Sequence, residues 1–411
     1  MTNEEKNQLL YSIRDHLKAN RSRIAEANAK DLAAAEELLA QGELSQAVVK
    51  RLALQGDKID QLFNYLDGVA KLDDPVGQRQ FAMRLDTGMD LERVSCPLGV
   101  VAVIFESRPE VVVQVTALSL KSSNGVLLKG GREAAHTNRA LWELIDEALA
   151  QKGLEGAVGL MESREDVGAL LLQEDYVDLI IPRGGNEFVR YIQENTKIPV
   201  LGHAEGICHI YLDDAADLEM ALSLVVDAKT DYPSACNALE TLLVHRDLAP
   251  KVLPQLFSKL QAAGVELRVT EELQPYGQGL ETAIDADWEC EYTDLILSVK
   301  AVGDLDEAIS HINRYGSGHT DSIVTSNPER ANRFLDAVDS ACVFHNSSTR
   351  FSDGFVFGLG AEVGISTNKT HARGPVGLEG LVIYKYKLRG SGQIKGDYSG
   401  PHAKPFLHQP L

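Results

Sequence analysis

Gly99-Val-Val-Ala-Val-Ile-Phe105 is an unbroken apolar run, and it gives the first indication of the fold class. A strand with one solvated face alternates apolar and polar residues, whereas a strand buried on both faces of a parallel sheet does not. Ser107-Arg-Pro-Glu110 follows with the spacing of a capping box and a proline suited to the first helical turn, so a helix is expected through Lys121. The run and this helix predict a parallel strand-and-helix unit.

The alternation of strands and helices extends along most of the chain. Helical patterns precede the run at about 2–39 and 45–72, and an alternating segment at 89–96 is typical of an exposed strand. After it, strands are expected at 126–129, 158–161 and 178–181, with helices at 133–150 and from 186 to about 194. A helix is also expected at 218–228. A second series starts after Cys236 and has helices at 249–263 and 304–315, and strands at 239–244, 265–269, 294–299, 322–325 and 341–344. Two such series predict two α/β domains, each with a parallel sheet between helices.

The composition is that of an ordinary globular chain of 411 residues, with 44% hydrophobic and 24% charged residues. Its 60 acidic and 40 basic residues give a net charge of −20, which argues against nucleic acid or an anionic membrane as a partner. The polar N-terminus does not resemble a signal peptide, and no apolar run reaches membrane length. We therefore expect a cytoplasmic protein.

Neither a disulfide framework nor a metal site is expected. The five cysteines are widely spaced and include no Cys-x-x-Cys pair. The eleven histidines include no His-Glu-x-x-His motif, which argues against catalytic zinc. A Ser-His-Asp hydrolase is disfavoured because no Gly-x-Ser-x-Gly elbow is present.

Lys229-Thr-Asp-Tyr-Pro-Ser-Ala-Cys236-Asn places one cysteine between an expected helix and an expected strand. Pro233 stops the helix, and small residues leave the Cys236 sulfur approachable. A cysteine at an element boundary beside free backbone N–H groups can have its pKa lowered and act as a nucleophile. The alternative is a small buried hydrophobe, as most free cysteines are.

Two glycine pairs, Lys129-Gly-Gly-Arg132 and Arg183-Gly-Gly-Asn186, each follow an expected strand and open a helix. Backbone N–H groups at such a turn can hold a phosphate or a ribose. The alternative is that the glycines only make tight turns and that the basic side chains are solvated. No Gly-x-Gly-x-x-Gly or P-loop motif is present. His319-Thr-Asp321 precedes another strand, where it could contact a ligand or only hydrogen-bond its own loop.

Several segments together resemble the aldehyde dehydrogenase superfamily, and more closely its members that reduce an acyl phosphate in proline biosynthesis. The resemblance runs from Asp31 to about Lys387. The segments that carry it are Phe105-Glu-Ser-Arg-Pro109, Val126-Leu-Leu-Lys-Gly-Gly131, Asp231-Tyr-Pro-Ser-Ala-Cys236-Asn, 302–323 and Arg373-Gly-Pro-Val-Gly-Leu-Glu379.

The resemblance implies an aldehyde dehydrogenase-like fold of two α/β domains with parallel sheets and an oligomerisation flap. We expect an NADP-binding domain at 1–228 with a return segment near 350–380, and a catalytic domain at 229–349. A hairpin at 85–98 and the tail at 381–411 would form the flap, which predicts a homo-oligomer. A functional pairing with glutamate 5-kinase is a further expectation.

The resemblance also implies NADPH-dependent reduction of L-glutamyl 5-phosphate to L-glutamate 5-semialdehyde, through a thioester on Cys236. Hydrolytic members of the superfamily carry a glutamate that activates water, and the aligned position here is nearest Gly202 in Leu201-Gly-His-Ala-Glu205. The asparagine of their oxyanion hole is also replaced, with Ser107 nearest to it. A hydrolytic semialdehyde dehydrogenase and a non-catalytic nucleotide-binding relative remain the alternatives.

By the same resemblance, Lys129 would bind the adenine ribose of NADP and Glu291 the nicotinamide ribose. Arg132 could pair with the 2′-phosphate, which favours NADPH over NADH. The turn Arg183-Gly184-Gly185 would face the pyrophosphate, and Gly130 and Gly131 at the other turn would also bind the cofactor. The candidates for substrate contacts are Ser107, Asn237, His319, Asp321, Asn346 and Arg350.

Overall fold

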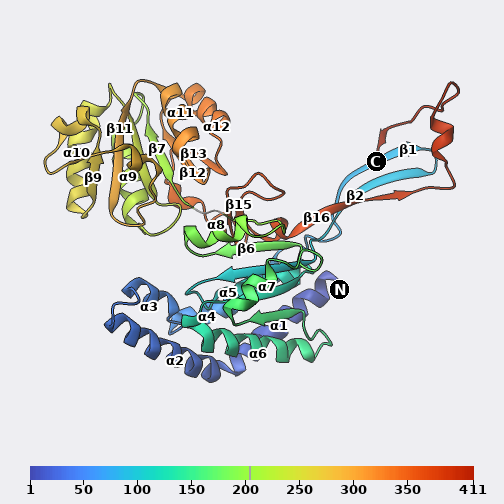
Figure 1. The fold of residues 1–411 in the computed structure, drawn as a ribbon. Coiled ribbons are helices and arrows are strands. Elements are labelled where there is room, and N and C mark those ends of the chain that lie inside the picture. Colours follow the sequence, from blue (N-terminus) through green and yellow to red (C-terminus); the bar gives the residue numbers. More distant parts are fainter. Residues whose placement is uncertain (203–204) are drawn as a thin grey trace.

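The computed structural model describes residues 1–202 and 205–411, which form two α/β units and a long arm (Figure 1). Both units are built on parallel sheets, and the arm is an antiparallel sheet. The predicted α/β class is therefore confirmed. No helix in the described ranges is both long enough and apolar enough to span a membrane.

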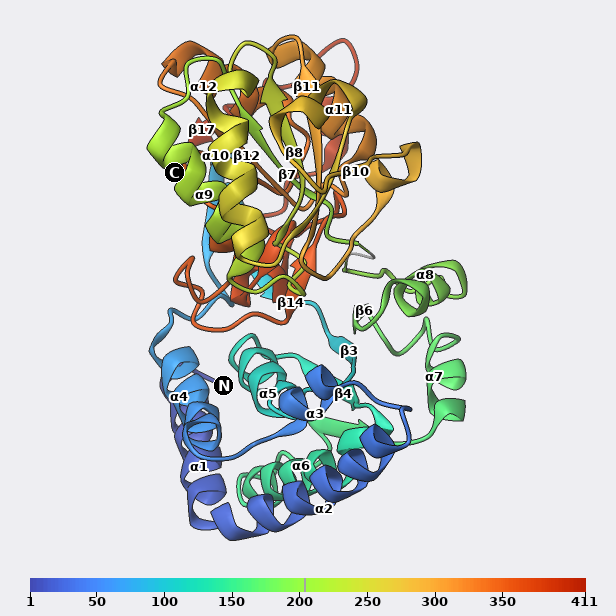
Figure 2. The same cartoon turned by 90° about the vertical axis from the view of Figure 1, so that its left-hand side faces the viewer.

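The first unit is a sheet of order β5-β4-β3-β6 with helices on both faces (Figure 2). Its elements are α1 (Asn3–Ala19), α2 (Arg21–Ala40), α3 (Gln46–Leu52), α4 (Asp57–Lys71), β3 (Val100–Phe105), α5 (Val111–Lys121), β4 (Gly125–Lys129), α6 (Ala135–Ala150), β5 (Val158–Met161), α7 (Arg164–Leu170), β6 (Leu179–Arg183) and α8 (Asn186–Glu194). Val101, Val103 and Phe105 pack against α1, α4, α5 and α6. Ala102 and Ile104 pack on the other face against α7 and α8. The apolar run is thus buried on both faces, as its composition predicts.

The two helical regions predicted before the run are each divided. Asn20 separates α1 from α2, and its side-chain amide donates to the carbonyl of His16 at 2.9 Å. Gly56, with φ of +56°, stands directly before α4. A side-chain amide that caps a helix, and a glycine in a backbone region that other residues avoid, are local reasons for a helix to stop.

The second unit is a parallel sheet of order β10-β9-β11-β8-β7-β12-β13. Its elements are β7 (Cys208–Leu212), α9 (Leu218–Thr230), β8 (Leu239–His245), α10 (Ala249–Ala262), β9 (Glu266–Val269), β10 (Glu281–Thr282), β11 (Ile296–Val302), α11 (Leu305–Tyr315), β12 (Thr320–Val324), α12 (Pro328–Ala337) and β13 (Cys342–His345). One hydrophobic core joins the sheet to α9 and α10, and another joins it to α11 and α12.

The units divide earlier in the chain than the sequence suggests. The second sheet includes β7, and α9 packs on that sheet, so the predicted division between 228 and 229 falls inside the second unit. The short strand β7 contains His209, a polar residue that is buried only because Asp321 accepts hydrogen bonds from it. A pattern of apolar residues does not reveal that partner. The cofactor and catalytic roles assigned to the two units stay predictions.

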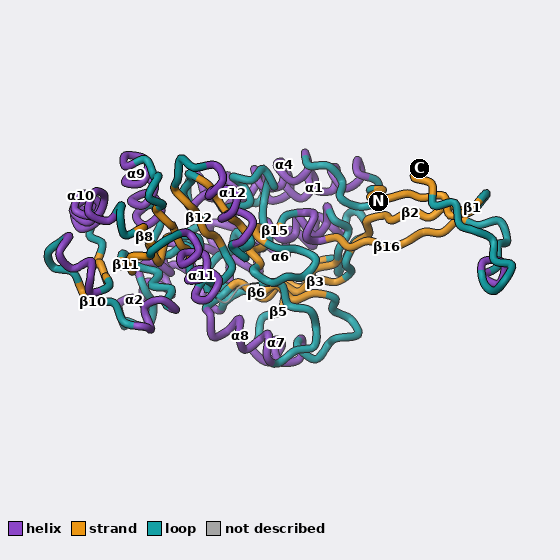
Figure 3. The backbone as a smooth tube through the Cα atoms, turned by 90° about the horizontal axis from the view of Figure 1, so that it is seen from above, coloured by secondary structure: helices purple, strands orange, loops and turns teal. Residues whose placement is uncertain are grey.

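The arm is a sheet of order β16-β2-β1-β17 that extends away from both units (Figure 3). Its strands are β1 (Arg79–Asp86), β2 (Met89–Pro97), β16 (Val382–Arg389) and β17 (Gln409–Pro410). A small antiparallel pair, β14 (Gly364–Ser366) and β15 (Gly374–Val376), lies in the chain that returns toward the arm. The hairpin predicted at 85–98 and the tail predicted at 381–411 therefore share one sheet. That this sheet joins subunits stays a prediction.

Candidate active site

Cys236 lies half-buried in the loop between α9 and β8, at the amino edge of the second sheet. The buried thiol of Cys208 donates to the carbonyl oxygen of Cys236 at 3.3 Å. Burial raises the pKa of Cys208, so this thiol stays protonated and remains a donor. In the described part of the chain, the N–H of Cys236 donates to no backbone carbonyl, so it is available to an oxyanion.

Gly206 packs directly against this loop. A Cβ atom at Gly206 would lie 2.6 Å from both the Cα and the carbonyl carbon of Cys236. Backbone atoms cannot move aside as a flexible side chain can, so glycine is required at position 206. This contact joins the nucleophile loop to the segment that connects the two units.

A buried ion pair closes the base of the same loop. Lys229 at the end of α9 donates to Glu240 in β8 at 2.7 Å, and neither side chain is exposed. Burial raises the pKa of Glu240 to about 7, although Lys229 opposes the shift. The second oxygen of Glu240 accepts from the N–H of Thr293 at 3.4 Å. The pair therefore ties the Cys236 loop to the segment that carries Glu291.

The predicted cofactor residues of the first unit gather at one edge of its sheet. Strand β3 pairs in parallel with β4 on one side and with β6 on the other, so the chain reverses its direction of travel across the sheet there. Ligands of open α/β sheets bind at the carboxyl ends of the strands at such a switch point. Lys129 ends β4, Arg183 ends β6, and the two glycine pairs follow directly.

At three of the four glycines of this edge, neighbouring side chains already occupy the space that a Cβ atom would need. A Cβ atom would lie 3.2 Å from the ring of Phe105 if placed on Gly130, and 2.5 Å from the carboxyl carbon of Glu133 if placed on Gly131. On Gly184 it would lie 3.1 Å from the carboxylate of Glu106, whereas Gly185 faces open space. Close packing explains glycine at the first three positions; that this edge binds a dinucleotide stays a prediction.

The two basic residues beside these glycines differ. The side chain of Lys129 is buried, and its ammonium donates to the carbonyl of Gly130 at 2.6 Å. Arg132 is exposed at the start of a short 3₁₀ turn, Arg132–Ala134. An exposed guanidinium at this position can reach a ligand phosphate without losing an internal partner.

Ser107, the residue nearest to the missing oxyanion asparagine, has a left-handed backbone with φ of +51°. Its N–H and its hydroxyl both donate to one carboxylate oxygen of Glu133, at 2.6 and 2.8 Å. The hydroxyl can serve a substrate only if it leaves that carboxylate. The N–H of Cys236, which has no backbone acceptor in the described chain, stays the predicted oxyanion donor.

Asn237 and Arg350 lie beside the nucleophile. The amide nitrogen of Asn237 donates to the carbonyls of Arg350 and Ser352, at 3.3 and 3.1 Å. Its amide oxygen is buried and has no partner among the described residues. The Arg350 guanidinium donates to Asp231 at 3.1 Å, at the start of the same loop. These contacts bring both predicted substrate residues to the Cys236 loop.

The other three predicted substrate residues serve the interior of the second unit. Asp321 is fully buried and accepts from the backbone and ring of His209, at 2.8 and 3.0 Å. Asn346 holds the backbone of Thr325 through both ends of its amide, at 2.9 and 3.0 Å. His319 is buried beneath the nucleophile loop, with its ring 3.9 Å from the sulfur of Cys208. Because their polar groups are committed to the protein, we assign Asp321 and Asn346 structural roles.

A family model described as the aldehyde dehydrogenase family matches residues 1–275 and 295–364. The chain belongs to this family. It is 52% identical over 409 residues to gamma-glutamyl phosphate reductase of Natronomonas pharaonis, covering 99% of this chain and 93% of that relative. It is 54% identical over 410 residues to the protein of the same name from a Cyanothece species, covering 99% and 93%. The crystal structure of gamma-glutamyl phosphate reductase from Thermotoga maritima superposes with a TM-score of 0.92 at 40% identity, covering 96% and 95% of the two chains. The resemblance stated from the sequence is confirmed.

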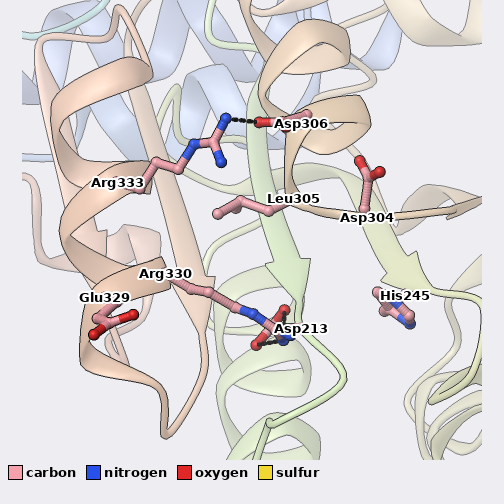
Figure 4. A pocket seen from close by; sticks show the side chains of 8 residues that line it. All are labelled: Asp213, His245, Asp304, Leu305, Asp306, Glu329, Arg330 and Arg333. Atoms are coloured by element: carbon pink, nitrogen blue, oxygen red, sulfur yellow. Dashed lines mark hydrogen bonds and ion pairs between the residues drawn. The ribbon is translucent and has the colours of Figure 1, made fainter.

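Two cavities lie away from Cys236. One, of about 310 Å³, is at the carboxyl edge of the second sheet, where Arg330 pairs with Asp213 at 2.9 Å and Arg333 pairs with Asp306 (Figure 4). Cys236 precedes β8 and so lies at the opposite edge of that parallel sheet. The other, of about 1270 Å³, lies between the base of the arm and the first unit. Within the described residues, no group of His, Cys, Asp or Glu side chains could hold a metal ion.

Sequence reasoning missed Gly206, Cys208 and the pair Lys229–Glu240. One signal for the pair was present, because Glu240 is the single charged residue in Leu239-Glu-Thr-Leu-Leu-Val244, a strand that is otherwise apolar except for Thr241. A carboxylate in a fully buried strand requires a partner. Gly206 and Cys208 gave no local signal, because their contact with Cys236 exists only in the folded chain. Residues 203 and 204, within the segment aligned with the missing general base, lie outside the described residues.

Proposed function

We propose that this protein reduces L-glutamyl 5-phosphate to L-glutamate 5-semialdehyde and phosphate, with NADPH, in proline biosynthesis. The observation that carries the proposal is the position of Cys236. Its loop is half-buried and is braced by Gly206 in the segment that connects the two units, by Cys208 and by the pair Lys229–Glu240. The relatives named above support the choice of substrate.

In the proposed reaction, the Cys236 thiolate attacks the acyl carbon of the substrate. A carbon–sulfur bond forms as the carbon–oxygen bond to phosphate breaks, which leaves a thioester on the protein. The N–H of Cys236 stabilises the oxyanion that develops on the acyl oxygen. Removal of one such donor typically costs about 2.7–4 kcal/mol of barrier.

The edge formed by β3, β4 and β6 would hold the dinucleotide. Lys129, Gly130 and Gly131 would contact the adenosine side, and Arg132 would pair with the 2′-phosphate that distinguishes NADPH from NADH. Glu291 would hold the nicotinamide ribose. NADPH would supply the hydride. The hydrogen bond from the N–H of Thr293 to Glu240 would position the segment of Glu291, and with it the ribose, relative to the Cys236 loop.

A hydrolytic outcome would need a carboxylate base near the thioester. The nearest described carboxylate in the aligned segment is Glu205, and it forms an ion pair with Arg190. This ion pair holds the carboxylate on a guanidinium instead of on a water molecule. This pairing favours transfer to phosphate over hydrolysis.

The test is oxidation of glutamate 5-semialdehyde with NADP⁺, with and without inorganic phosphate. We expect strict dependence on phosphate and complete loss of turnover in Cys236→Ser, with Cys96→Ser in the arm as the matched cysteine control. Phosphate-independent oxidation would indicate the hydrolytic enzyme. Cofactor binding without any turnover, combined with slow alkylation of Cys236 by iodoacetamide, would indicate a non-catalytic relative.

We also propose that the arm joins subunits of a homo-oligomer. Strand β16 is at the edge of its sheet, pairs only with β2 in the described chain, and exposes Ile383, Tyr384 and Leu388. Exposed apolar residues on a free strand edge favour pairing with another chain. Sedimentation of a 44.8 kDa species alone at micromolar concentration would contradict this proposal.

A further inference from the structure

Arg183 ends β6, and its side chain leaves the sheet toward the chain that returns from the second unit. Its backbone pairs with Phe105 at the carboxyl edge of the first sheet. A Cβ atom on Gly364 would lie 3.8 and 3.9 Å from Cγ and Cδ of Arg183, so the aliphatic stem runs along the backbone of Gly364. The chain that returns from the second unit therefore packs against a side chain of the first sheet.

This guanidinium has no counter-ion among the described residues. No ion pair within 4.0 Å includes Arg183, although such pairs are common elsewhere in the described chain. Solvent reaches part of the side chain, but Nη1 is buried and has no hydrogen-bond partner in the described part of the molecule. A cation removed from water without a partner is unfavourable, and arginine cannot relieve this by losing its proton. The arrangement is that of a site that waits for an anion.

The charges around Arg183 come from the first unit and from the return segment. Glu362 in the return segment and Glu110 before α5 attract the guanidinium, and Arg108 repels it. The Cys236 loop contacts the same return segment, because the amide nitrogen of Asn237 donates to the carbonyl of Ser352 at 3.1 Å and the stem of Arg183 runs along Gly364. The carboxylate of Glu362 already accepts a hydrogen bond from the N–H of Gly354, at 2.8 Å. An anion held by Arg183 would supply the close counter-charge and the hydrogen-bond acceptor that its buried Nη1 lacks in the described part of the chain.

We propose that Arg183 binds the phosphoryl group of the acyl phosphate beside Cys236, instead of the cofactor pyrophosphate that the sequence suggests for this turn. The inference rests on the proposed function. The phosphoryl group is attached through oxygen to the carbon that the sulfur attacks, so a cation close to the sulfur is close to that group. The substrate α-carboxylate is several carbon atoms farther along the chain.

In this arrangement Arg183 acts on the leaving group. As the carbon–sulfur bond forms, the carbon–oxygen bond breaks, and its electron pair leaves on inorganic phosphate. A guanidinium presents two parallel N–H donors to phosphate oxygens, which lysine cannot do. Arg183 would thus bind phosphate both as leaving group and, in the oxidative direction, as the incoming nucleophile.

The experiment compares the wild type with Arg183→Met and Arg183→Lys in the phosphate-dependent oxidation of the semialdehyde. We expect Arg183→Met to raise the KM for inorganic phosphate at least tenfold, while the KM for NADP⁺ changes less than twofold. The KM for phosphate of Arg183→Lys should lie between those of the wild type and Arg183→Met. Arg132→Met is the matched control, and it should raise the KM for NADP⁺ and leave that for phosphate unchanged.

A binding measurement separates this inference from the proposed function. Inorganic phosphate should slow the alkylation of Cys236 by iodoacetamide in the wild type and have no such effect in Arg183→Met, without cofactor or turnover. If instead Arg183→Met loses affinity for NADP⁺ and keeps its affinity for phosphate, the pyrophosphate role is correct and the inference is overturned. If the wild type oxidises the semialdehyde without phosphate, the proposed function itself fails.

Discussion

Replacement of Lys229 by methionine should strongly destabilise the second unit. The Lys229 ammonium and the Glu240 carboxylate lie 2.7 Å apart, and neither side chain is exposed. Methionine fills a similar volume but leaves the carboxylate buried without its counter-ion. Breaking a buried pair in this way costs about 3–5 kcal/mol. We therefore expect a loss of that size at pH 8.

The loss should depend on pH with a definite sign. Burial raises the pKa of Glu240 to about 7 from an ordinary value of 4.5. A carboxyl whose pKa is raised in the folded state binds more protons there than in the unfolded chain, so its contribution to stability falls as pH rises through that window. Removal of Lys229 raises this pKa further. The deficit of Lys229→Met should therefore be largest above pH 7 and shrink toward pH 5.

The assay is urea unfolding at pH 5.5 and pH 8, followed by the fluorescence of Trp288, which lies in the second unit, in a Trp142→Phe background. Lys197→Met is the matched control, because Lys197 pairs with Glu174 at 3.4 Å on the surface and should shift stability by less than about 1 kcal/mol. Adding Glu240→Gln to Lys229→Met should restore most of the loss. A Lys229→Met protein as stable as the Lys197→Met protein at pH 8 would refute the argument.

Two further predictions concern the nucleophile loop and the acid stability of the second unit. Gly206→Ala should displace the Cys236 loop and slow both turnover and Cys236 alkylation by about 10²-fold, because a misplacement near 1 Å has that effect. Gly168→Ala is the control: its new methyl group meets no atom within 4 Å, so both rates should stay unchanged. Burial lowers the pKa of His311 to about 3, with His209 and Lys300 adding to the shift, so the folded ring stays neutral while the unfolded ring takes a proton below about 6.5. Stability should therefore fall as pH drops from about 6.5 toward 3, by up to ~1.4 kcal/mol per pH unit from this group. His311→Phe should flatten that slope in urea unfolding measured between pH 7 and 4.5, and an unchanged slope would exclude His311 as the cause.

Local pattern was enough for most of the fold. The run Gly99–Phe105 predicted a strand buried on both faces, and it packs against helices on each side. Proline and small residues around Cys236 predicted an approachable loop between a helix and a strand, and the loop lies there. These features depend on neighbours in the chain, because backbone geometry and side-chain periodicity act over a few residues.

The site required the tertiary structure wherever two distant segments meet. Asp321 resembled a ligand contact in sequence, yet a buried histidine of β7 uses its carboxylate. Arg183 resembled a pyrophosphate contact in sequence, and only the folded chain shows that its Nη1 is buried without a hydrogen-bond partner among the described residues. The sequence by itself determined most of the strands and helices, and it predicted Cys236 as the nucleophile. The tertiary structure decided which polar groups already have hydrogen-bond partners and which remain for a ligand. These contacts join residues far apart in the chain, because a hydrogen bond or a desolvated charge depends on distance in space and not on separation in sequence.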